Sequence, residues 1–542
     1  MKNKKIKSLN LLDCTLRDGG YYNNWDFDIE LINQYLLAMH KSGIKFVELG
    51  FRGFPSLSYK GPCAYTTDQF LRLLKIPRKL KIGVMVNASE IINYGKGDII
   101  ANTKKLFPNK DMIDFVRVAC HFEELDVAAK ISSTLKTERL KIIYNVMQCS
   151  ERLDKEIETI GIKLNKFPID VLYFADSMGS LSSVQTSEII NLIKKNWKKE
   201  IGIHTHDNML RAFTNTDQAI MEGVSWVDGT VTGMGRGPGN IKTEYLLINY
   251  QNLISRKKID FLPILKLIEK YFQPLLQKYN WGTNPFYFMA GVNGIHPTFI
   301  QDILKDHRYS ISDKLLFIDH LKLTKSNKFD KNLLDIDRNL YKLPKPSIET
   351  KKWVPSSKLK NKTILILGNS PTLKKNIKLL ESFIKRKKPV VFGLNLQKSI
   401  NEKLINYRVV CNLFRLLTDK NKYKSTFTKI ILPKDRIQKN ILNSMKKNKI
   451  FNVDLRVSEG EFIFKNDSVI IPNSLVFSYA LGIAGSGQAS EILLAGFGSS
   501  AENEGKNIDM ERTLEIFSIK SKIKISSITN TNYKVDLKSI YD

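Results

Sequence analysis

Two histidines separated by a single residue are the clearest chemical feature of the chain. His204 and His206 lie in the segment 201–207, IGIHTHD, whose apolar residues are typical of a β-strand. Alternate residues of a strand point to the same face and the chain rises about 3.3 Å per residue, so the two imidazoles should project side by side. With a carboxylate such as Asp18 and an amide such as Asn240, they would form a mixed nitrogen and oxygen site. Such a site suits Mn, Mg, Co, Fe or Zn and leaves positions open for substrate oxygens; packed or solvated histidines are the structural alternative.

These residues are far apart in the sequence, so the fold must bring them together. Eight apolar, strand-like runs alternate with amphipathic helical stretches, and the runs are 9–15, 46–51, 82–86, 115–120, 141–147, 171–176, 201–206 and 226–233. Eight such units over roughly 250 residues predict an α/β fold with an N-terminal (β/α)8 barrel, also called a TIM barrel, in preference to an open doubly wound sheet. In this barrel the reactive side chains lie at the carboxyl ends of the strands.

Several polar residues lie in these runs or directly after them. We take Arg117, Asn145, Asp176 and Ser177 as candidates for substrate binding. An unpaired arginine inside a strand is costly to bury, so we expect Arg117 to face the barrel mouth and an anion. Asp176 has a second interpretation, as support for the metal ligands or as a partner of an arginine.

Glu48 lies in the second run, and two interpretations of it stay open. As a catalytic residue it would orient a water molecule or an acid group. As a structural residue it would pair with Arg17 or Arg52.

Five segments carry a resemblance to a known superfamily: LLDCTLRDGG, FVELGFR, YFADSMGS, IGIHTHDNMLRAFTNTDQAIMEG and GTVTGMGRGPGNIKTE. Over residues 9–300 the chain resembles the DRE-TIM metallolyases, the HMGL-like superfamily. That superfamily includes hydroxymethylglutaryl-CoA lyase, isopropylmalate and homocitrate synthases, and the 4-hydroxy-2-oxovalerate aldolases, which the chain resembles most. The resemblance implies a divalent-metal-dependent carbon–carbon lyase or aldolase that acts on a 2-oxo acid such as pyruvate and an aldehyde. It implies Mn or Mg as the metal ahead of Co or Zn.

The resemblance also implies residue roles. The family's metal ligands match Asp18, His204 and His206, and a fourth ligand of the lyase and synthase branches matches Asn240. Arg17 matches the arginine that holds the enolate oxygen, where a fixed cation stabilises developing negative charge. By the same resemblance, Ser177 would contact the carboxylate of pyruvate.

The chain departs from the aldolase pattern at the acid/base positions. The family's histidine three residues after the metal aspartate is replaced by Tyr21, and its late tyrosine is replaced by Asn293. The candidate substitutes are Tyr21 and His296, and a purely structural histidine before Pro297 is the alternative for the latter. A different acid/base group suggests a different aldehyde acceptor. An acetyl-CoA-dependent Claisen-type synthase and a non-catalytic binding protein on a retired barrel remain alternatives.

We expect the barrel domain to span residues 8–256 and further segments to follow it. Residues 257–324 indicate a helical extension, 325–361 a linker, and 362–542 a smaller Rossmann-like α/β domain of unknown role. Residues 368–372, between a strand and a helix, are either an ordinary turn or a phosphate site. A loose resemblance to domains beside sugar-modifying enzymes implies a nucleotide- or sugar-linked substrate and a role in bacterial surface polysaccharide biosynthesis.

Composition sets broader expectations. The formal net charge is +31, which we attribute to lysines spread over the surface in preference to a nucleic-acid-binding stripe. The five cysteines are scattered and form no CxxC pair, which indicates a reducing compartment. No apolar run is long enough to span a membrane and no secretory signal is visible. We therefore expect a cytoplasmic protein, and a homo-oligomer.

Overall fold

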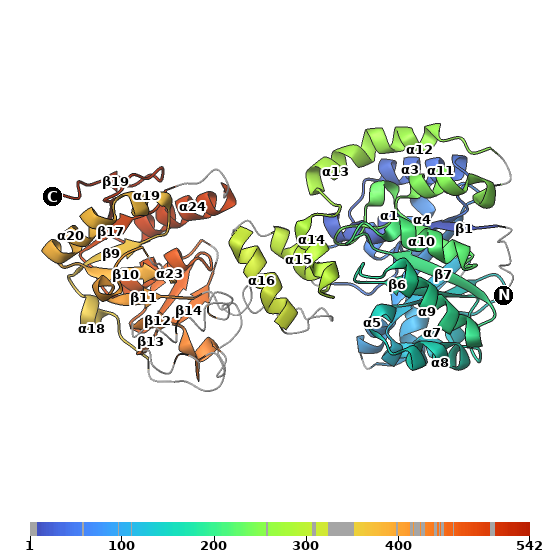
Figure 1. The fold of residues 1–542 in the computed structure, drawn as a ribbon, viewed down its shortest axis with the longest axis horizontal. Coiled ribbons are helices and arrows are strands. Elements are labelled where there is room, and N and C mark those ends of the chain that lie inside the picture. Colours follow the sequence, from blue (N-terminus) through green and yellow to red (C-terminus); the bar gives the residue numbers. More distant parts are fainter. Residues whose placement is uncertain are drawn as a thin grey trace. The chain divides into compact units, whose positions relative to one another are not determined.

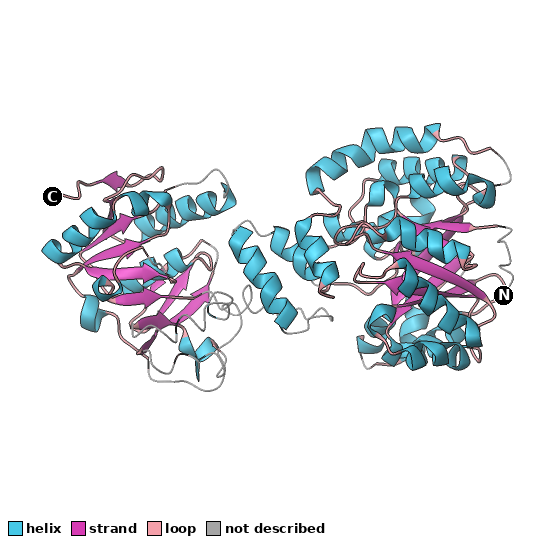
Figure 2. Cartoon of the chain, viewed as in Figure 1, coloured by secondary structure: helices cyan, strands magenta, loops and turns pink. Residues whose placement is uncertain are grey.

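The computed structural model describes most of the chain in two compact units. It describes residues 8–323 and 352–541, apart from 57–58, 96, 110, 256–257, 306–310, 397–398, 412–415, 417–422, 424–428, 438–441, 444, 446–448, 459 and 499–503. Among the described residues, one unit comprises residues up to 302 and 321–323, and the other comprises 303–320 and the residues from 352 onward. Figure 1 labels their elements, and Figure 2 separates helices from strands.

The first unit is a closed barrel of eight parallel strands, as predicted. Its strands are β1 (Asn10–Asp13), β2 (Phe46–Phe51), β3 (Lys81–Asn87), β4 (Phe115–Cys120), β5 (Lys141–Val146), β6 (Val171–Asp176), β7 (Glu200–Thr205) and β8 (Trp226–Gly229). The barrel closes because β1 pairs with both β2 and β8. Three predicted runs, 46–51, 115–120 and 171–176, coincide with strands residue for residue. These runs are almost wholly buried, which is what a parallel sheet covered on both faces requires.

The first strand ends earlier than the predicted run 9–15. Thr15 donates hydrogen bonds to Asp13 Oδ1 from its backbone N–H at 2.9 Å and from its hydroxyl at 2.6 Å. These bonds turn the chain into α1 (Thr15–Asp18), because a side-chain acceptor competes with the strand ladder. Arg17 and Asp18 therefore lie on a one-turn helix above the barrel.

Helices surround the barrel. They are α2 (Gly20–Asn23), α3 (Ile29–Lys41), α4 (Asp68–Leu73), α5 (Ala88–Asn93), α6 (Ile99–Leu106), α7 (Leu125–Leu135), α8 (Asp154–Leu164), α9 (Ser183–Asn196), α10 (Ala212–Met221) and α11 (Thr243–Ile254). The helices α3, α4, α6 and α9 begin at side-chain caps, as at Asp28, whose carboxylate accepts from Glu30 N and Leu31 N. Each of them buries one stripe against the sheet, which holds the strand ends at fixed positions.

A run of helices follows the barrel in sequence. It comprises α12 (Leu262–Leu267), the π-helical turn η5 (Ile268–Phe272), α13 (Gln273–Tyr279), α14 (Pro285–Val292), α15 (Pro297–Lys305) and α16 (Ile311–Leu323). From α15, Gln301 accepts a hydrogen bond from Gly237 N at 3.0 Å and donates one to Tyr21 O at 3.3 Å. This run of helices therefore ties together the loops that follow β1 and β8.

The second unit is an α/β domain built on a parallel sheet of eight strands in the order β13-β12-β11-β10-β9-β17-β18-β19. The strands are β9 (Thr363–Leu367), β10 (Val390–Leu394), β11 (Tyr407–Val409), β12 (Ile430–Leu432), β13 (Ile450–Asn452), β17 (Glu491–Ala495), β18 (Lys524–Ser527) and β19 (Asp536–Leu537). The order reverses beside β9, as in doubly wound sheets. A separate small sheet outside the main one holds β14 (Asp454–Val457), β15 (Ile463–Phe464) and β16 (Ser468–Ile471).

Helices cover both faces of the main sheet. Ile364 and Ile366 of β9 pack with the core formed by α23 (Val476–Ser486) and α24 (Glu504–Lys520). Leu365 and Leu367 pack with α19 (Pro371–Lys375) and α20 (Ile377–Lys387). This alternation is the two-residue period of a strand buried on both faces.

The predicted linker 325–361 lies largely outside the described residues. The structure describes its last part, residues 352–361, which belongs to the second unit. There α18 (Ser356–Leu359) places Leu359 fully buried in the domain core, and Trp353 packs against Phe451. The second domain thus begins before the predicted residue 362. A four-residue helix among lysines has too short an apolar pattern to be recognised.

Candidate metal centre

The three predicted metal ligands from distant segments converge at the carboxyl end of the barrel. Ligand atoms of Asp18 on α1, His204 on β7 and His206 just after β7 all lie within 4.8 Å of one another. His204 Nε2 is 3.7 Å from Asp18 Oδ2, and the two imidazole centroids are 5.0 Å apart. His206 also pairs with Asn240 in an isolated β-bridge, which brings the fourth candidate to the same place. The structure therefore gathers all four residues.

The unsatisfied atoms of this cluster fit a divalent cation. Asp18 Oδ2, His206 Nδ1 and Asn240 Oδ1 are buried and make no hydrogen bond. A buried polar atom without a partner costs about 1–3 kcal/mol, and these atoms are all of types that ligate metals. Gly235 keeps the space open, because a Cβ there would overlap Asn240 Oδ1 and lie 2.9 Å from Asp18 Oδ2.

The electrostatic environment sets the protonation states that metal ligands need. Burial raises the pKa of Asp18, but the charge of Arg17 is the largest of the effects that outweigh burial and hold that pKa well below its usual range. Burial, assisted by the charge of Arg236, holds the pKa of His206 well below its usual value. The carboxylate is thus ionised and this imidazole neutral, and ligands must be deprotonated to bind metal.

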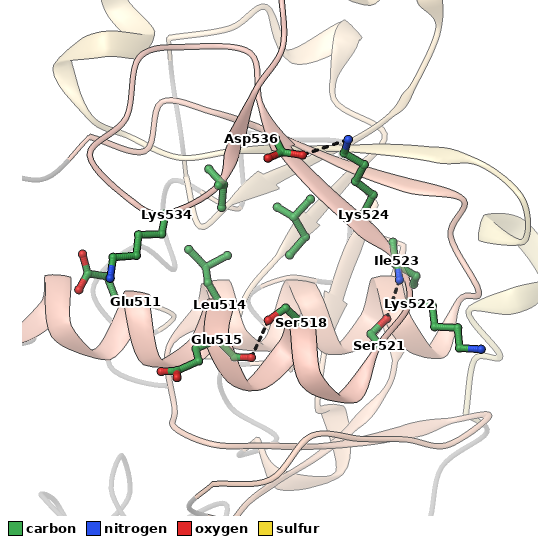
Figure 3. A pocket seen from close by; sticks show the side chains of 12 residues that line it. Glu511, Leu514, Glu515, Ser518, Ser521, Lys522, Ile523, Lys524, Lys534 and Asp536 are labelled. Carbon is green, nitrogen blue, oxygen red and sulfur yellow. Dashed lines mark hydrogen bonds and ion pairs between the residues drawn. The ribbon is translucent and has the colours of Figure 1, made fainter.

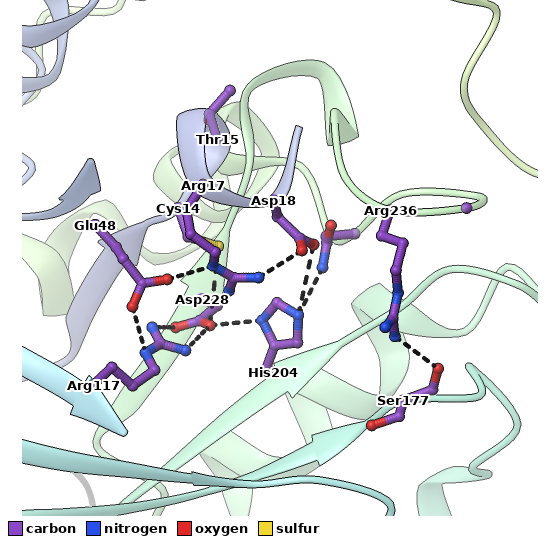
Figure 4. A network of polar contacts seen from close by, with 12 residues as sticks. Cys14, Thr15, Arg17, Asp18, Glu48, Arg117, Ser177, His204, Asp228 and Arg236 are labelled. Carbon is purple, nitrogen blue, oxygen red and sulfur yellow. Dashed lines mark hydrogen bonds and ion pairs between the residues drawn. The ribbon is translucent and has the colours of Figure 1, made fainter. Parts of the chain in front are cut away.

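Arg17 is held from two sides in a buried ion-pair network (Figure 4). Its Nη1 donates to Asp18 Oδ1 at 2.5 Å, and its Nε donates to Glu48 Oε1 at 2.6 Å. Its remaining nitrogen, Nη2, is buried without a hydrogen-bond partner. Glu48 therefore pairs with Arg17, as its structural interpretation expects, and fixes the orientation of that guanidinium.

The same network continues to His204. Arg117 binds Asp228 through two hydrogen bonds of 2.6 and 2.8 Å, and its Nε lies 2.9 Å from Glu48 Oε2. Asp228 Oδ2 accepts from His204 Nδ1 at 2.6 Å. Burial raises the pKa of Asp228, yet Arg117 and the His204 hydrogen bond lower it to about 2. An acceptor at Nδ1 holds a proton there and leaves a lone pair on Nε2, as metal binding requires. In the structure Asn240 Nδ2 donates to His204 Nε2 at 3.1 Å, and Asp18 Oδ2 lies 3.7 Å from the same nitrogen.

This geometry corrects the expectation for Arg117. We predicted that it would face the barrel mouth and an anion, but it is fully buried and two carboxylates of the protein occupy its guanidinium. The partner is Asp228, which the sequence analysis did not select. The only signal for it is a carboxylate inside the apolar run 226–233, where an ion is rarely buried unpaired.

The substrate-binding candidates lie around the ends of β5 and β6. Ser177 Oγ accepts from Gln148 N at 3.2 Å, and Asn145 Oδ1 is buried without a hydrogen-bond partner. Asp176 has a different position: its carboxylate accepts from Ser180 N at 3.0 Å and Leu181 N at 3.3 Å. Burial raises the pKa of Asp176 to about 7 despite these hydrogen bonds. Asp176 therefore shapes the loop that carries Ser177.

The two acid/base candidates lie within the electrostatic reach of this site. The Tyr21 ring contacts Trp25 edge-on, with centroids 4.8 Å apart, and the Arg236 guanidinium lies 5.9 Å from the Tyr21 centroid. The pKa of Tyr21 is raised, because burial raises it more than the charge of Arg236 lowers it. Burial, followed by the charges of Arg236 and His206, holds the pKa of His296 well below its usual value. Their catalytic roles remain predictions.

Arg236 is the second residue that the sequence analysis did not select. It follows β8 in the glycine-rich segment 233–240, where a cationic side chain between flexible residues gives no sign of its surroundings. In the structure it donates a 3.4 Å hydrogen bond to Ser177 O, and so connects the loops after β6 and β8.

The second domain offers no comparable cluster in its described residues. A cavity of about 760 Å³ is lined by α24, β18 and β19 (Figure 3), with lysines and carboxylates intermixed; Lys524 and Asp536 pair at 3.0 Å. It lies at the amino ends of these strands, whereas α/β sheets bind ligands at the carboxyl ends. In the predicted turn 368–372, Gly368 N and Ser370 N donate to backbone carbonyls, so two of its amides are not available to a phosphate.

Comparisons with known proteins agree with the barrel fold. The HMGL-like family model matches residues 113–270. A 4-hydroxy-2-oxovalerate aldolase of Brevibacillus brevis is 25% identical over 272 residues, which cover 49% of this chain and 77% of the relative. Another, from Geobacillus thermodenitrificans, is 26% identical, with coverages of 49% and 76%. The crystal structure of the N-terminal domain of a protein assigned as an aldolase, from Bacteroides vulgatus, is 33% identical. That match covers 56% of this chain and 98% of the domain, with a TM-score of 0.50.

A (β/α)8 barrel with two histidines, an aspartate and an arginine at its carboxyl end is the architecture of a barrel metallolyase. The chain belongs to the HMGL-like family of the DRE-TIM superfamily, and the predicted resemblance and the predicted class of carbon–carbon lyase are confirmed. Among the residues that the structure describes, no helix combines the length and the apolar character that crossing a membrane requires.

Proposed function

We propose that the chain is a divalent-metal-dependent aldolase or lyase. In this proposal it stabilises the enolate of pyruvate or a similar 2-oxo acid, and makes or breaks a carbon–carbon bond to an aldehyde. The observation that carries the proposal is the set of partnerless buried atoms: Asp18 Oδ2, His206 Nδ1 and Asn240 Oδ1 beside Arg17 Nη2. Relatives with the name 4-hydroxy-2-oxovalerate aldolase support the substrate class.

Asp18, His204, His206 and Asn240 would hold the cation, with Mn or Mg as our first choice. Such an ion polarises the 2-oxo group and lowers the free-energy cost of forming the enolate. The retired-barrel alternative is not favoured, since a site without a cation would keep three buried lone pairs unsatisfied.

Arg17 would stabilise the enolate oxygen. Two of its nitrogens are already oriented by Asp18 and Glu48, so Nη2 needs no reorganisation when negative charge develops. Ser177 and Asn145 would contact the carboxylate of the 2-oxo acid. Their positions at the ends of β6 and β5 support this assignment.

Proton transfer to or from the acceptor oxygen would fall to Tyr21 or His296. Since burial keeps the His296 imidazole neutral, it can accept a proton at neutral pH. The Tyr21 hydroxyl stays protonated and can donate one. The polysaccharide pathway and a nucleotide- or sugar-linked substrate of the second domain remain predictions.

Enolate formation can be tested without knowing the aldehyde. Pyruvate incubated in D2O with the full chain and Mn should exchange its methyl protons, which NMR measures. The Arg17→Gln variant should exchange about 100- to 1000-fold more slowly, the range seen when one oxyanion donor is removed. Absence of exchange by the metal-loaded wild type would contradict the proposal. Release of free thiol from acetyl-CoA in the presence of 2-oxo acids would instead favour the Claisen-type synthase.

A further inference from the structure

The Arg236 side chain is half-buried near the metal-ligand candidates, and its charge is one of those that lower the pKa of Asp18. Among the described residues it makes no ion pair, its Nε is buried without a hydrogen-bond partner, and its one hydrogen bond is the long contact to Ser177 O. The other arginines buried in the barrel differ: Arg17, Arg52 and Arg117 each pair with a carboxylate. A partly desolvated guanidinium without a counter-ion is a receptor for an anion.

The position of Arg236 places this receptor on the side of the acid/base candidates. Its guanidinium lies over the Tyr21 ring, and its charge is the largest of those that act on the pKa of His296. Figure 4 shows Arg236 and Ser177 on the opposite side of His204 from Glu48 and Arg117. Arg17, which belongs to the proposed enolate site, is part of that other group. Arg236 therefore lies near Tyr21 and His296, the two residues proposed to exchange a proton with the acceptor oxygen.

The backbone around Arg236 is fixed in place. The Tyr22 hydroxyl donates to Gly237 O, and Gly237 N donates to Gln301 at 3.0 Å. Gly237 has φ +66°, a backbone conformation that residues other than glycine rarely adopt. The guanidinium thus starts from an anchored loop, which reduces the entropy lost when it binds a ligand.

We propose that Arg236 binds a carboxylate or phosphate carried by the aldehyde acceptor, so that the enzyme prefers anionic aldehydes. The inference rests on the proposed function and deepens it. An arginine fork matches both anions through paired hydrogen bonds, and its Nε edge is available for them.

Two aldehydes of equal carbon number test the preference. The full chain with Mn and pyruvate should use glyoxylate, an anion, with a higher kcat/KM than glycolaldehyde, which is neutral. In Arg236→Gln, kcat/KM for glyoxylate should fall about 10- to 100-fold through KM, the loss expected for one hydrogen-bonded ion contact, while that for glycolaldehyde changes little. Arg236→Lys should recover part of the loss. The pair D-glyceraldehyde 3-phosphate and D-glyceraldehyde extends the same comparison to phosphate.

A binding measurement gives a readout that does not depend on turnover. Inorganic phosphate titrated calorimetrically into the chelator-treated full chain should bind the wild type and Arg236→Lys, and should not bind Arg236→Gln. Arg211→Gln is the matched control, since Arg211 is an exposed residue on the neighbouring loop after β7. Phosphate binding that all variants share would overturn the proposal.

The outcomes separate this inference from the proposed function. Equal losses for charged and neutral acceptors in Arg236→Gln, with pyruvate exchange intact, would overturn the role of Arg236 alone. A rise in KM for pyruvate exchange would show that Arg236 binds the donor carboxylate, which also overturns it. No exchange by the wild type would remove the proposed function and this inference together.

Discussion

At the scale of single residues, the site is organised by a chain of buried charges that joins two metal-ligand candidates. Asp18 contacts Arg17, and His204 contacts Asp228, and both pairs lead to Glu48 and Arg117 between them. Such partners orient the ligands before any cation arrives. Buried ions are strongly destabilising when one partner is lost, so this network should also govern stability.

The Asp228→Asn substitution tests the orientation of His204. An amide can donate to Nδ1 and allow the other tautomer, which would place a proton on Nε2. We expect metal affinity to fall about 10- to 100-fold, measured by competition with a chelator. Asp170→Asn serves as control, because Asp170 pairs with Lys136 before β6, at the opposite end of the barrel. Unchanged affinity in Asp228→Asn would contradict the assigned role.

The Gly235→Ala substitution tests the space around the cation. A methyl group there would displace Asn240 and crowd Asp18. We therefore expect loss of stoichiometric metal, measured by elemental analysis, with the circular dichroism spectrum of the fold retained. Gly498→Ala, whose added Cβ would meet ordinary contacts at 3.4 Å, should behave as the wild type. Full metal content in Gly235→Ala would exclude Asn240 and Asp18 as ligands in the present arrangement.

At the scale of elements, the loops after the strands determine where these residues lie. Asp176 holds the loop between β6 and α9, and burial raises its folded-state pKa to about 7 from the usual 3.8. At a pH between these two pKa values, Asp176 keeps its proton in the folded state but has released it in the unfolded state. Stability should therefore fall as the pH rises from about 4 to about 7, and the contribution of Asp176 should be constant above that range.

Urea unfolding of the wild type and Asp176→Asn at a series of pH values measures this effect. Between pH 4 and pH 7 the free energy of unfolding should fall in the wild type. It should fall much less in Asp176→Asn, because the asparagine side chain does not titrate. Parallel pH profiles for the two proteins would show that the Asp176 carboxyl is ionised in the folded state throughout.

The elements that were predictable were those with long patterns. The eight barrel runs were found because buried apolar residues dominate them. The pairs His204 with His206 and Arg17 with Asp18 could be recognised because each pair is local in the sequence. Strands of two to four residues in the second domain, such as β15 and β19, are too short to show a period. Asp228 and Arg236 were missed because their roles depend on partners elsewhere: Arg117 is 111 residues from Asp228 in sequence, and Ser177 is 59 from Arg236.

At the scale of the whole molecule, the two units have separate cores and the candidate site lies entirely in the first. The crystallised Bacteroides vulgatus domain, of which this chain covers 98%, was studied as an N-terminal domain alone. We predict that a shortened chain of residues 1–323 will fold and bind metal with the same stoichiometry as the full chain. Elemental analysis and thermal unfolding check this. Loss of metal in the shortened chain would mean that the second unit contributes to the site.

In the proposed function, Asp18, His204 and His206 bind one divalent cation where the enolate forms. Anomalous scattering from crystals grown with Mn and oxalate locates that cation. We expect one Mn peak about 2.0–2.3 Å from Asp18 Oδ2 and from a nitrogen of each histidine, with oxalate beside Arg17. A map in which Mn binds elsewhere, or in which these three residues hold no ion, would refute the proposed metal site.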